Sequence, residues 1–258
     1  MLKNNRSLFI LILAILPLLG FYTGWNQQQS WWQRKQEKEP PKVMETLYEN
    51  IGYKITIEFT KGKEHNHPLM AFWIEDTLGN YIQSLYVAKS IAKGYFRHGD
   101  ASTGRWQPGP LRRPAALPYW GHKRGIQAPD GYYIPTRDDP MPDVVTGPTP
   151  KADFILNTKT EHVEPDVFNI LMEINQSWNW NRYWHNARFP DDPHYQTSSQ
   201  PALVYKTTVD INNLQPHYQM KVIGHSHWSG QTGELFEDLS TITTALEIVE
   251  KVVVRVER

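Results

Sequence analysis

Short runs of alternating apolar and polar residues, separated by turn-forming residues, dominate the chain from about residue 43 onward. Segment 53–60 has the period of two that is typical of a half-buried β-strand. Segments 69–75 and 81–88 flank Asp76-Thr-Leu-Gly-Asn80, whose turn chemistry predicts a hairpin. Further strands are predicted at 153–158, 167–174, 202–210, 218–223 and 251–257.

Helical periodicity is sparse, and one short helix is predicted around Thr241–Glu250. Two long irregular stretches, 94–150 and 175–201, interrupt the strands and are rich in Trp, Tyr and Arg. Loops of this length are uncommon in a compact domain and are usually functional or disordered, and their aromatic content argues against disorder. We therefore predict an all-β domain of the β-sandwich type, with long Pro-, Gly- and Trp-rich loops folded over one face or end of it.

The first residues have the order of charges and apolar side chains that is typical of an export signal. Lys3 and Arg6 precede an apolar run over residues 8–22, which favours insertion of the run into a membrane. Cleavage and retention both stay open, because no small-x-small cleavage site is easily placed and the aromatic residues within 21–25 lengthen the run. We predict an exported protein, either periplasmic or tethered to the outer face of the cytoplasmic membrane. An uncleaved segment contacts the membrane through residues 8–25.

These features divide the chain into three parts. Residues 1–25 are predicted to be a signal peptide or anchor helix, 26–42 a polar linker that ends in Pro40-Pro41, and 43–258 the β-sandwich domain.

Charge and cysteine content narrow the classes of function. Lys and Arg number 27 and Asp and Glu number 27, so no net field attracts nucleic acid, and no nucleic-acid partner is predicted. Cysteine is absent, which excludes disulfides, thiolate metal sites, Cys nucleophiles and a lipidated N-terminal Cys. The domain must therefore be stabilised by its core alone.

Two His-x-His pairs are candidate metal ligands. Side chains at i and i+2 of an extended chain point the same way, so His225 and His227 could present two imidazoles to one divalent metal ion. The alternative is a polar loop whose histidines bond to the backbone. His65 and His67 form a second pair, for which the alternative is solvent exposure.

A basic and aromatic loop is a candidate site for an anionic small molecule. Arginine forks suit carboxylate or phosphate, and neighbouring aromatic rings can stack on a flat ligand. The alternative is that the arginines pair with Asp100, Asp130, Asp138 or Asp139 and hold the loop in place. The candidate ligand-binding residues of this loop are Arg112, Arg113, Trp120, His122 and Arg124.

A third candidate is the loop that carries Trp178, Trp180 and Trp184, interspersed with Asn. A stacking platform with amide groups suits a sugar, whereas the alternative is that the aromatic rings close one end of the sandwich. No nucleophile elbow, His-Glu-x-x-His motif or phosphate-binding glycine loop is present, so an enzyme is not favoured.

Several segments of the chain resemble a family of exported bacterial domains of unknown function, related to a domain sometimes appended to FAD:protein FMN transferases. The resemblance implies an immunoglobulin-like β-sandwich and a link to extracytoplasmic redox or metal physiology, and it carries no catalytic residues. The family more often has Ala in place of Pro148. The matching segments are 71–86, 113–125, 142–150, 173–178 and 224–230 through Thr244-Ala245.

These observations together predict an extracytoplasmic binding or accessory module, metal- or redox-linked, whose partner is an anionic small molecule or a membrane protein. Two alternatives stay open. One is a hydrolase that acts on glycans through residues 178–192, and the other is a structural membrane-tethered subunit.

Overall fold

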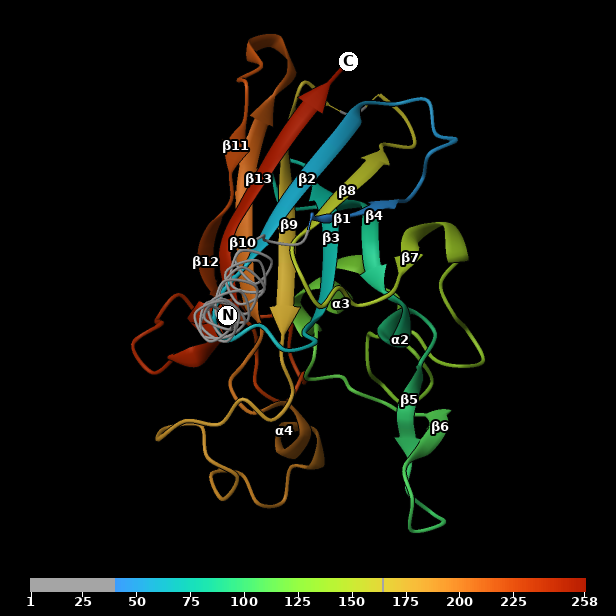
Figure 1. Ribbon diagram of the computed structural model, residues 1–258, viewed down its shortest axis with the longest axis vertical. Helices are drawn as coiled ribbons and strands as arrows, with labels where there is room; N and C mark the ends of the chain where they lie inside the picture. Colours follow the sequence, from blue (N-terminus) through green and yellow to red (C-terminus); the bar gives the residue numbers. More distant parts are fainter. Residues whose placement is uncertain (1–39, 164) are drawn as a thin grey trace, which may run out of the picture. The chain divides into compact units, whose positions relative to one another are not determined.

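Two β-sheets contain most of the strands in the computed structural model, which describes residues 40–163 and 165–258 (Figure 1). The first sheet has five strands, in the order β1, β8, β2, β13 and β11. Strand β2 pairs antiparallel with β8 and β13, whereas β1 runs parallel to β8. These strands are β1 (Lys42–Glu45), β2 (Lys54–Lys61), β8 (Phe154–Lys159), β11 (Tyr218–Gln219) and β13 (Val249–Glu257).

The second sheet has six strands, in the order β12, β10, β9, β3, β4 and β7. All neighbours pair antiparallel except β4 and β7, which are parallel. The strands are β3 (Leu69–Glu75), β4 (Tyr81–Ala88), β7 (Thr146–Gly147), β9 (Val167–Asn175), β10 (Leu203–Asp210) and β12 (Lys221–His225).

Both sheets contribute to one hydrophobic core. Phe154 of β8 stacks on Phe59 of β2 with ring centroids 4.7 Å apart, and meets Phe72 of β3 edge-on at 6.5 Å. The outward side chains of β2 are half-buried or exposed, and its inward side chains are buried. This alternation is the reason that β2 could be predicted from its period of two.

The second sheet is covered on its other face as well. A second apolar cluster there includes Trp73, Trp120 and Leu171, and it joins the sheet to the segment that carries α2 and α3. All seven residues of β3 are consequently buried. The remaining elements are α2 (Lys89–Ala92), β5 (Tyr95–Asp100), β6 (Gln107–Pro110), α3 (Pro118–Arg124), η1 (Asp143–Val145), α4 (Pro193–Ser198), η2 (Ile211–Asn213) and η3 (Thr244–Glu247).

The β-rich class and seven of the predicted strands are confirmed, whereas segment 218–223 is not one strand. Tyr218–Gln219 pairs in the first sheet and Lys221–His225 pairs in the second. Met220, between them, is buried in the core that the sheets share. The chain changes sheet at this residue, which alternation alone does not reveal.

The helix predicted at Thr241–Glu250 is wrong in extent. A single 3₁₀ turn spans Thr244–Glu247, and β13 begins at Val249. The β-branched residues that follow favour a strand, and pairing with β2 decides the outcome. The irregular stretch 94–150 carries the two-stranded β5–β6 ribbon and helix α3.

Residues from Pro41 to Arg258 form one compact unit. The predicted signal or anchor at 1–25 lies outside the described residues, as does the linker up to residue 39. Within the described part of the chain, no helix has the length and apolar character needed to span a bilayer.

Candidate functional site

The two long loops meet at an open pocket of about 450 Å³. His98 of β5, Trp106 and Arg113 come from the first loop, and Trp178 comes from the second. In Figure 1, the β5–β6 ribbon and the segment around α4 both extend beyond the same ends of the sheet strands. Trp106 is 64% exposed and Trp178 is 60% exposed, so two indole rings face solvent at one site. Exposed indoles beside a cation are suited to ligand binding rather than to core packing.

Arg113 is a half-buried cation that has no acidic partner among the described residues. Its Nη1 donates to Ser177 Oγ at 2.8 Å and to Thr197 O at 3.3 Å, and its guanidinium carbon lies 5.3 Å from the Phe96 ring centroid. Its Nε is buried without a hydrogen-bond partner among the described residues. Within the same residues, no carboxylate lies in ion-pair distance of it. Burial lowers the pKa of Arg113, because desolvation disfavours its charged form.

Trp178 has a backbone conformation that L-residues rarely adopt. Its φ is +65°, in the left-handed region, where a bulky side chain is strained. The indole ring meets Trp180 edge-on with centroids 6.5 Å apart. Strain of this kind is concentrated at functional sites, and here it coincides with an exposed aromatic ring on the pocket wall.

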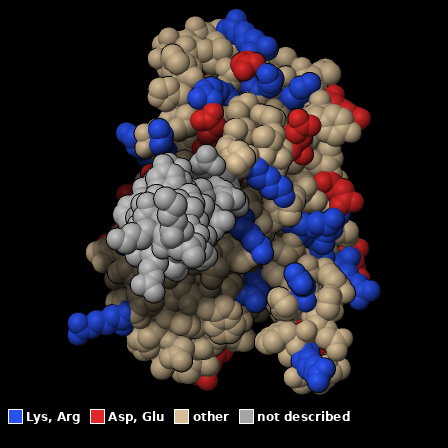
Figure 2. All heavy atoms as spheres, viewed as in Figure 1, with Lys and Arg blue, Asp and Glu red and all other residues tan. Residues whose placement is uncertain are grey.

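Basic side chains are numerous near this site. In Figure 2, Lys and Arg gather over the part of the surface where Figure 1 draws α2 and β5. The chain is neutral as a whole, so attraction for anions must come from local concentrations of Lys and Arg such as this one.

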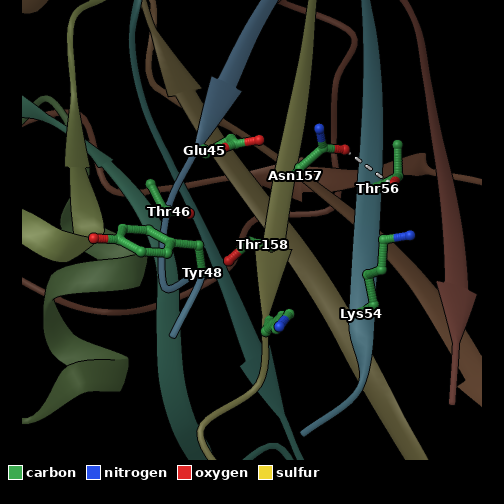
Figure 3. Close-up of a pocket in the computed structure, with 8 residues that line it drawn as sticks. Glu45, Thr46, Tyr48, Lys54, Thr56, Asn157 and Thr158 are labelled. Atoms are coloured by element: carbon green, nitrogen blue, oxygen red, sulfur yellow. Dashed lines mark hydrogen bonds between the residues drawn. The ribbon is translucent and has the colours of Figure 1, made fainter. Parts of the chain in front are cut away.

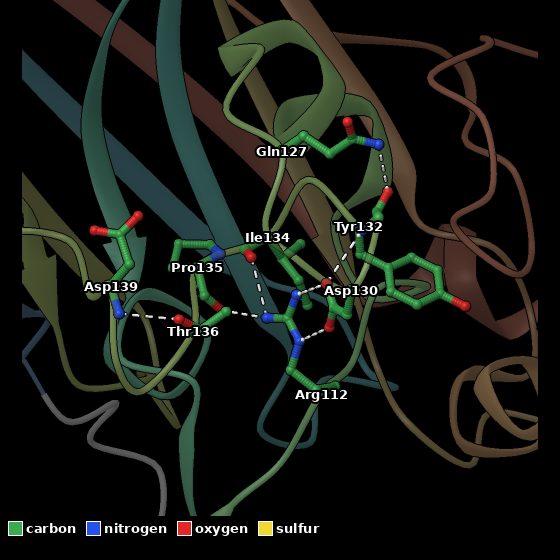
Figure 4. Close-up of polar contacts among 9 residues, drawn as sticks. Arg112, Gln127, Asp130, Tyr132, Ile134, Pro135, Thr136 and Asp139 are labelled. Carbon is green, nitrogen blue, oxygen red and sulfur yellow. Dashed lines mark hydrogen bonds and ion pairs between the residues drawn. The ribbon is translucent and has the colours of Figure 1, made fainter.

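Arg112, the neighbour of Arg113, is used to hold the loop together (Figure 4). Its Nε and Nη2 donate to the two carboxylate oxygens of Asp130 at 2.6 and 2.9 Å. Its Nη1 donates to the carbonyls of Ile134 and Pro135. The guanidinium holds the pKa of Asp130 below its usual range. All three guanidinium nitrogens of Arg112 therefore donate hydrogen bonds within the protein. This agrees with the alternative prediction that the arginines of this loop pair with its aspartates and hold it in place.

The three candidates on α3 are part of the packing against the second sheet. Trp120 is completely buried, and its Nε1 donates to Ser84 Oγ at 2.9 Å. The His122 ring stacks on Tyr133 with centroids 4.2 Å apart. The Arg124 guanidinium lies 5.4 Å from the Trp120 ring centroid. None of the three lines the pocket of Arg113.

Trp180 and Trp184 contribute to the closed end of the core. Trp184 is 4% exposed and its Nε1 donates to Thr241 Oγ1 at 3.2 Å. Trp180 packs against the same core and meets Tyr195 edge-on at 5.8 Å. The structure thus separates the three tryptophans of this loop, and only Trp178 faces the pocket.

His225 and His227 are buried among aromatic rings rather than gathered at a metal site. His225 Nδ1 lies 2.8 Å from Ser226 O and therefore carries the proton. His227 Nδ1 accepts from Ser229 N at 3.2 Å, so its lone pair is already used. Burial lowers the pKa of both imidazoles, which keeps them neutral.

The described residues around the histidines supply no further metal ligands. Among residues 40–163 and 165–258, no group of three or more His, Asp or Glu side chains is placed to hold a metal ion. His65 Nε2 lies 3.0 Å from Pro150 O, and His67 Nδ1 lies 2.8 Å from Asn66 Oδ1. The alternative of a backbone-bonded histidine fits His225. The alternative of solvent exposure fits His67, whereas His65 is half-buried.

The sequence did not identify Glu173, which is completely buried on β9. Its carboxylate accepts the backbone N–H groups of Tyr119 and Trp120 in the first turn of α3, at 3.2 and 2.7 Å. Desolvation by burial raises the pKa of Glu173 to about 8. A single acidic residue within the apolar run Ile170-Leu-Met-Glu-Ile174 was the signal that could have revealed it.

No protein-family model, curated protein or solved structure matches the chain.

Proposed function

We propose that the protein is a binding or accessory module that captures a small ring-bearing anion in the pocket between Arg113 and Trp178. The observation that carries this proposal is the half-buried guanidinium of Arg113, which has no carboxylate partner among the described residues and lies beside two exposed indoles. An isolated desolvated cation is costly, and a ligand carboxylate or phosphate offsets that cost through charge-assisted hydrogen bonds. The indoles of Trp106 and Trp178 offer faces for a flat or sugar ring.

Binding is favoured over glycan hydrolysis. A glycoside hydrolase needs two carboxyl groups that flank the scissile bond, and no carboxyl group of the described residues lines this pocket. The buried carboxylates of Glu75 and Glu173 are instead held inside the protein. Glu75 accepts from Trp73 Nε1 at 2.8 Å and lies 3.7 Å from Lys123 Nζ.

We further propose that the module works outside the cytoplasm and belongs to the family that its segments resemble. The order of charges and apolar residues in 3–22 supports export, and a membrane partner follows if the segment is retained. Two sheets with one shared core support an immunoglobulin-like β-sandwich. A redox or metal link rests on the family resemblance alone.

Calorimetric titration of the full chain tests the binding proposal. The probes are glucuronate, galacturonate and benzoate, each compared with its neutral counterpart glucose, galactose or benzamide. We expect at least one anion to bind, and its neutral counterpart to bind more than tenfold more weakly, since a hydrogen bond to a charged group contributes roughly 1.5–3 kcal/mol.

Two substitutions assign the binding to the pocket. Arg113→Gln removes the cation and is expected to abolish the preference for the anion, whereas Arg182→Gln, at an exposed arginine in the second loop, leaves it unchanged. Equal binding by Arg113→Gln and the parent protein, or no binding of any anion at millimolar concentration, overturns the proposal.

A further inference from the structure

A second hollow, of about 330 Å³, lies on the outer face of the first sheet (Figure 3). It crosses β1, β8 and β2, far along the chain from the two loops that form the pocket of Arg113. Its size is within the range of small-molecule sites. The lining residues are Glu45, Thr46, Tyr48, Lys54, Thr56, Asn157, Thr158 and Lys159.

Strand register places three different polar groups in one row of this hollow. Asn157 lies opposite Glu45 on one side and opposite Thr56 on the other. Thr56 Oγ1 donates to Asn157 Oδ1 at 3.2 Å, which leaves the Nδ2 of Asn157 without a partner among the described residues. The Glu45 carboxylate likewise has no hydrogen bond or ion pair within that part of the chain. The row thus presents one hydrogen-bond acceptor, the Glu45 carboxylate, beside one donor, the Asn157 Nδ2 group, and neither has a partner among the described residues.

Thr158 also lines the hollow, but its hydroxyl is not one of the groups offered to a ligand there. Along β8 it alternates with Asn157 and shares the buried positions of Phe154 and Leu156. Its side chain therefore lies on the core side of the sheet, and the outer face presents Glu45, Asn157 and Thr56.

Tyr48 places an aromatic ring at the rim of the hollow. The residue is 61% exposed, and it follows Leu47, whose φ of +51° ends β1 in a left-handed turn. The turn is held by two contacts of Asn50, whose N donates to Leu47 O at 3.1 Å and whose Nδ2 donates to Lys159 O at 3.4 Å. Figure 3 shows the Tyr48 ring beside Thr158 on the opposite side from Asn157.

We propose that this hollow is a second ligand site, which holds a neutral saccharide ring against Tyr48. Vicinal hydroxyls of a sugar act as donor and acceptor at once, which matches the Glu45 carboxylate and the Asn157 amide. Lys54 is already paired with Glu257 at 2.9 Å, and the remaining charges of the lining, those of Glu45 and Lys159, balance each other, so the hollow has no net charge that favours an anion or a cation. The ligand class therefore differs from that of the Arg113 pocket, and the two proposals do not depend on each other.

Saturation-transfer NMR and calorimetry with four neutral tetrasaccharides test this site on the full chain. The probes are cellotetraose, maltotetraose, mannotetraose and chitotetraose, in a zwitterionic detergent because sugar-headed detergents compete. We expect at least one probe to bind, Tyr48→Ala to weaken it about tenfold or more, and Tyr48→Phe, which keeps the ring, to retain it. Glu45→Gln and Asn157→Ala are each expected to weaken binding severalfold.

Two matched controls make the outcome decisive. Tyr95→Ala removes another exposed tyrosine, 42% exposed, and is expected to leave saccharide binding unchanged. Trp178→Ala is expected to have no effect either. If Trp178→Ala loses saccharide binding and Tyr48→Ala retains it, the saccharide binds in the pocket of Arg113 and Trp178 instead, and the proposal is overturned. Absence of binding by all four probes at about 10 mM also overturns the proposal, because this concentration exceeds the Kd of even weak useful binding.

Discussion

The Glu173 carboxylate accepts the backbone N–H of Trp120 at 2.7 Å in the interior of the protein, and this bond ties the central strand β9 to the start of α3. The acid is completely buried, and burial raises its pKa to about 8, so its protonation is coupled to folding.

Glu173→Gln is expected to flatten the dependence of stability on pH. Burial raises the pKa of Glu173 from 4.5 to about 8, so the folded state holds an extra proton between these pH values. The free energy of unfolding therefore falls as the pH rises from about 4.5 to about 8, by roughly 1 kcal/mol per pH unit from this group at most. Urea unfolding at pH 5, 6.5 and 8 measures the slope. Glu49→Gln, at an exposed acid, should retain the parent slope, and an equal slope for Glu173→Gln contradicts the prediction.

Phe154→Ala is expected to destabilise the domain by about 3–5 kcal/mol, because the ring packs against both sheets and its loss leaves a cavity between them. Val43→Ala, at a residue 56% exposed on β1, should change stability by less than about 0.5 kcal/mol. Chemical unfolding of the two variants compares them directly. A loss below about 1 kcal/mol for Phe154→Ala would mean that the sheets do not depend on this contact.

Arg112→Lys is expected to loosen the loop around Asp130 without changing anion binding at Arg113. Lysine cannot reproduce the two parallel hydrogen bonds to the carboxylate, and both side chains are partly exposed, so the loss should be about 1 kcal/mol. Hydrogen exchange of residues 127–136 should accelerate. A double-mutant cycle with Asp130→Asn isolates the pair, and a coupling near zero would show that the bonds do not stabilise the loop.

Trp178→Gly and Trp178→Ala are expected to lose anion binding equally but to differ in stability. Glycine adopts a φ of +65° without steric cost, whereas alanine retains the strain, so the glycine variant should be about 1 kcal/mol more stable. Thermal unfolding and calorimetric titration measure the two properties separately. Greater stability of the alanine variant would contradict the idea that the backbone is strained here.

His225 and His227 are expected to bind no stoichiometric divalent metal. The proton on His225 Nδ1 and the occupied lone pair on His227 Nδ1 leave the two rings in opposite tautomers. Elemental analysis of the full chain, purified from its native compartment, is the measurement. One equivalent of zinc in the parent protein that is lost in His225→Ala and in His227→Ala would restore the metal hypothesis.

The positions of the strands could be predicted from the sequence because side chains on β2 and its neighbours alternate between core and solvent. The burial of both faces of the second sheet could not be predicted from the sequence. For that reason Glu173 was not identified, because a polar residue on a strand is normally expected to face water. Arg113 and Trp178 were among the predicted ligand residues. The sequence could not separate them from Arg112 and Trp184, because only the fold decides which donors are already used and which rings remain outside.

The location of β13 between β2 and β11 has a consequence for the order in which the protein assembles. Arg255 of β13 forms an ion pair with Glu58 of β2, 197 residues earlier. The central pairing of β2 with β13 in the first sheet can therefore form only after β13 has been synthesised. Contacts between such distant parts of a chain form slowly, because a long loop must first be closed. If export proceeds through a channel that accepts only unfolded polypeptide, this delay keeps the chain unfolded, and therefore able to enter the channel, until β13 has been synthesised.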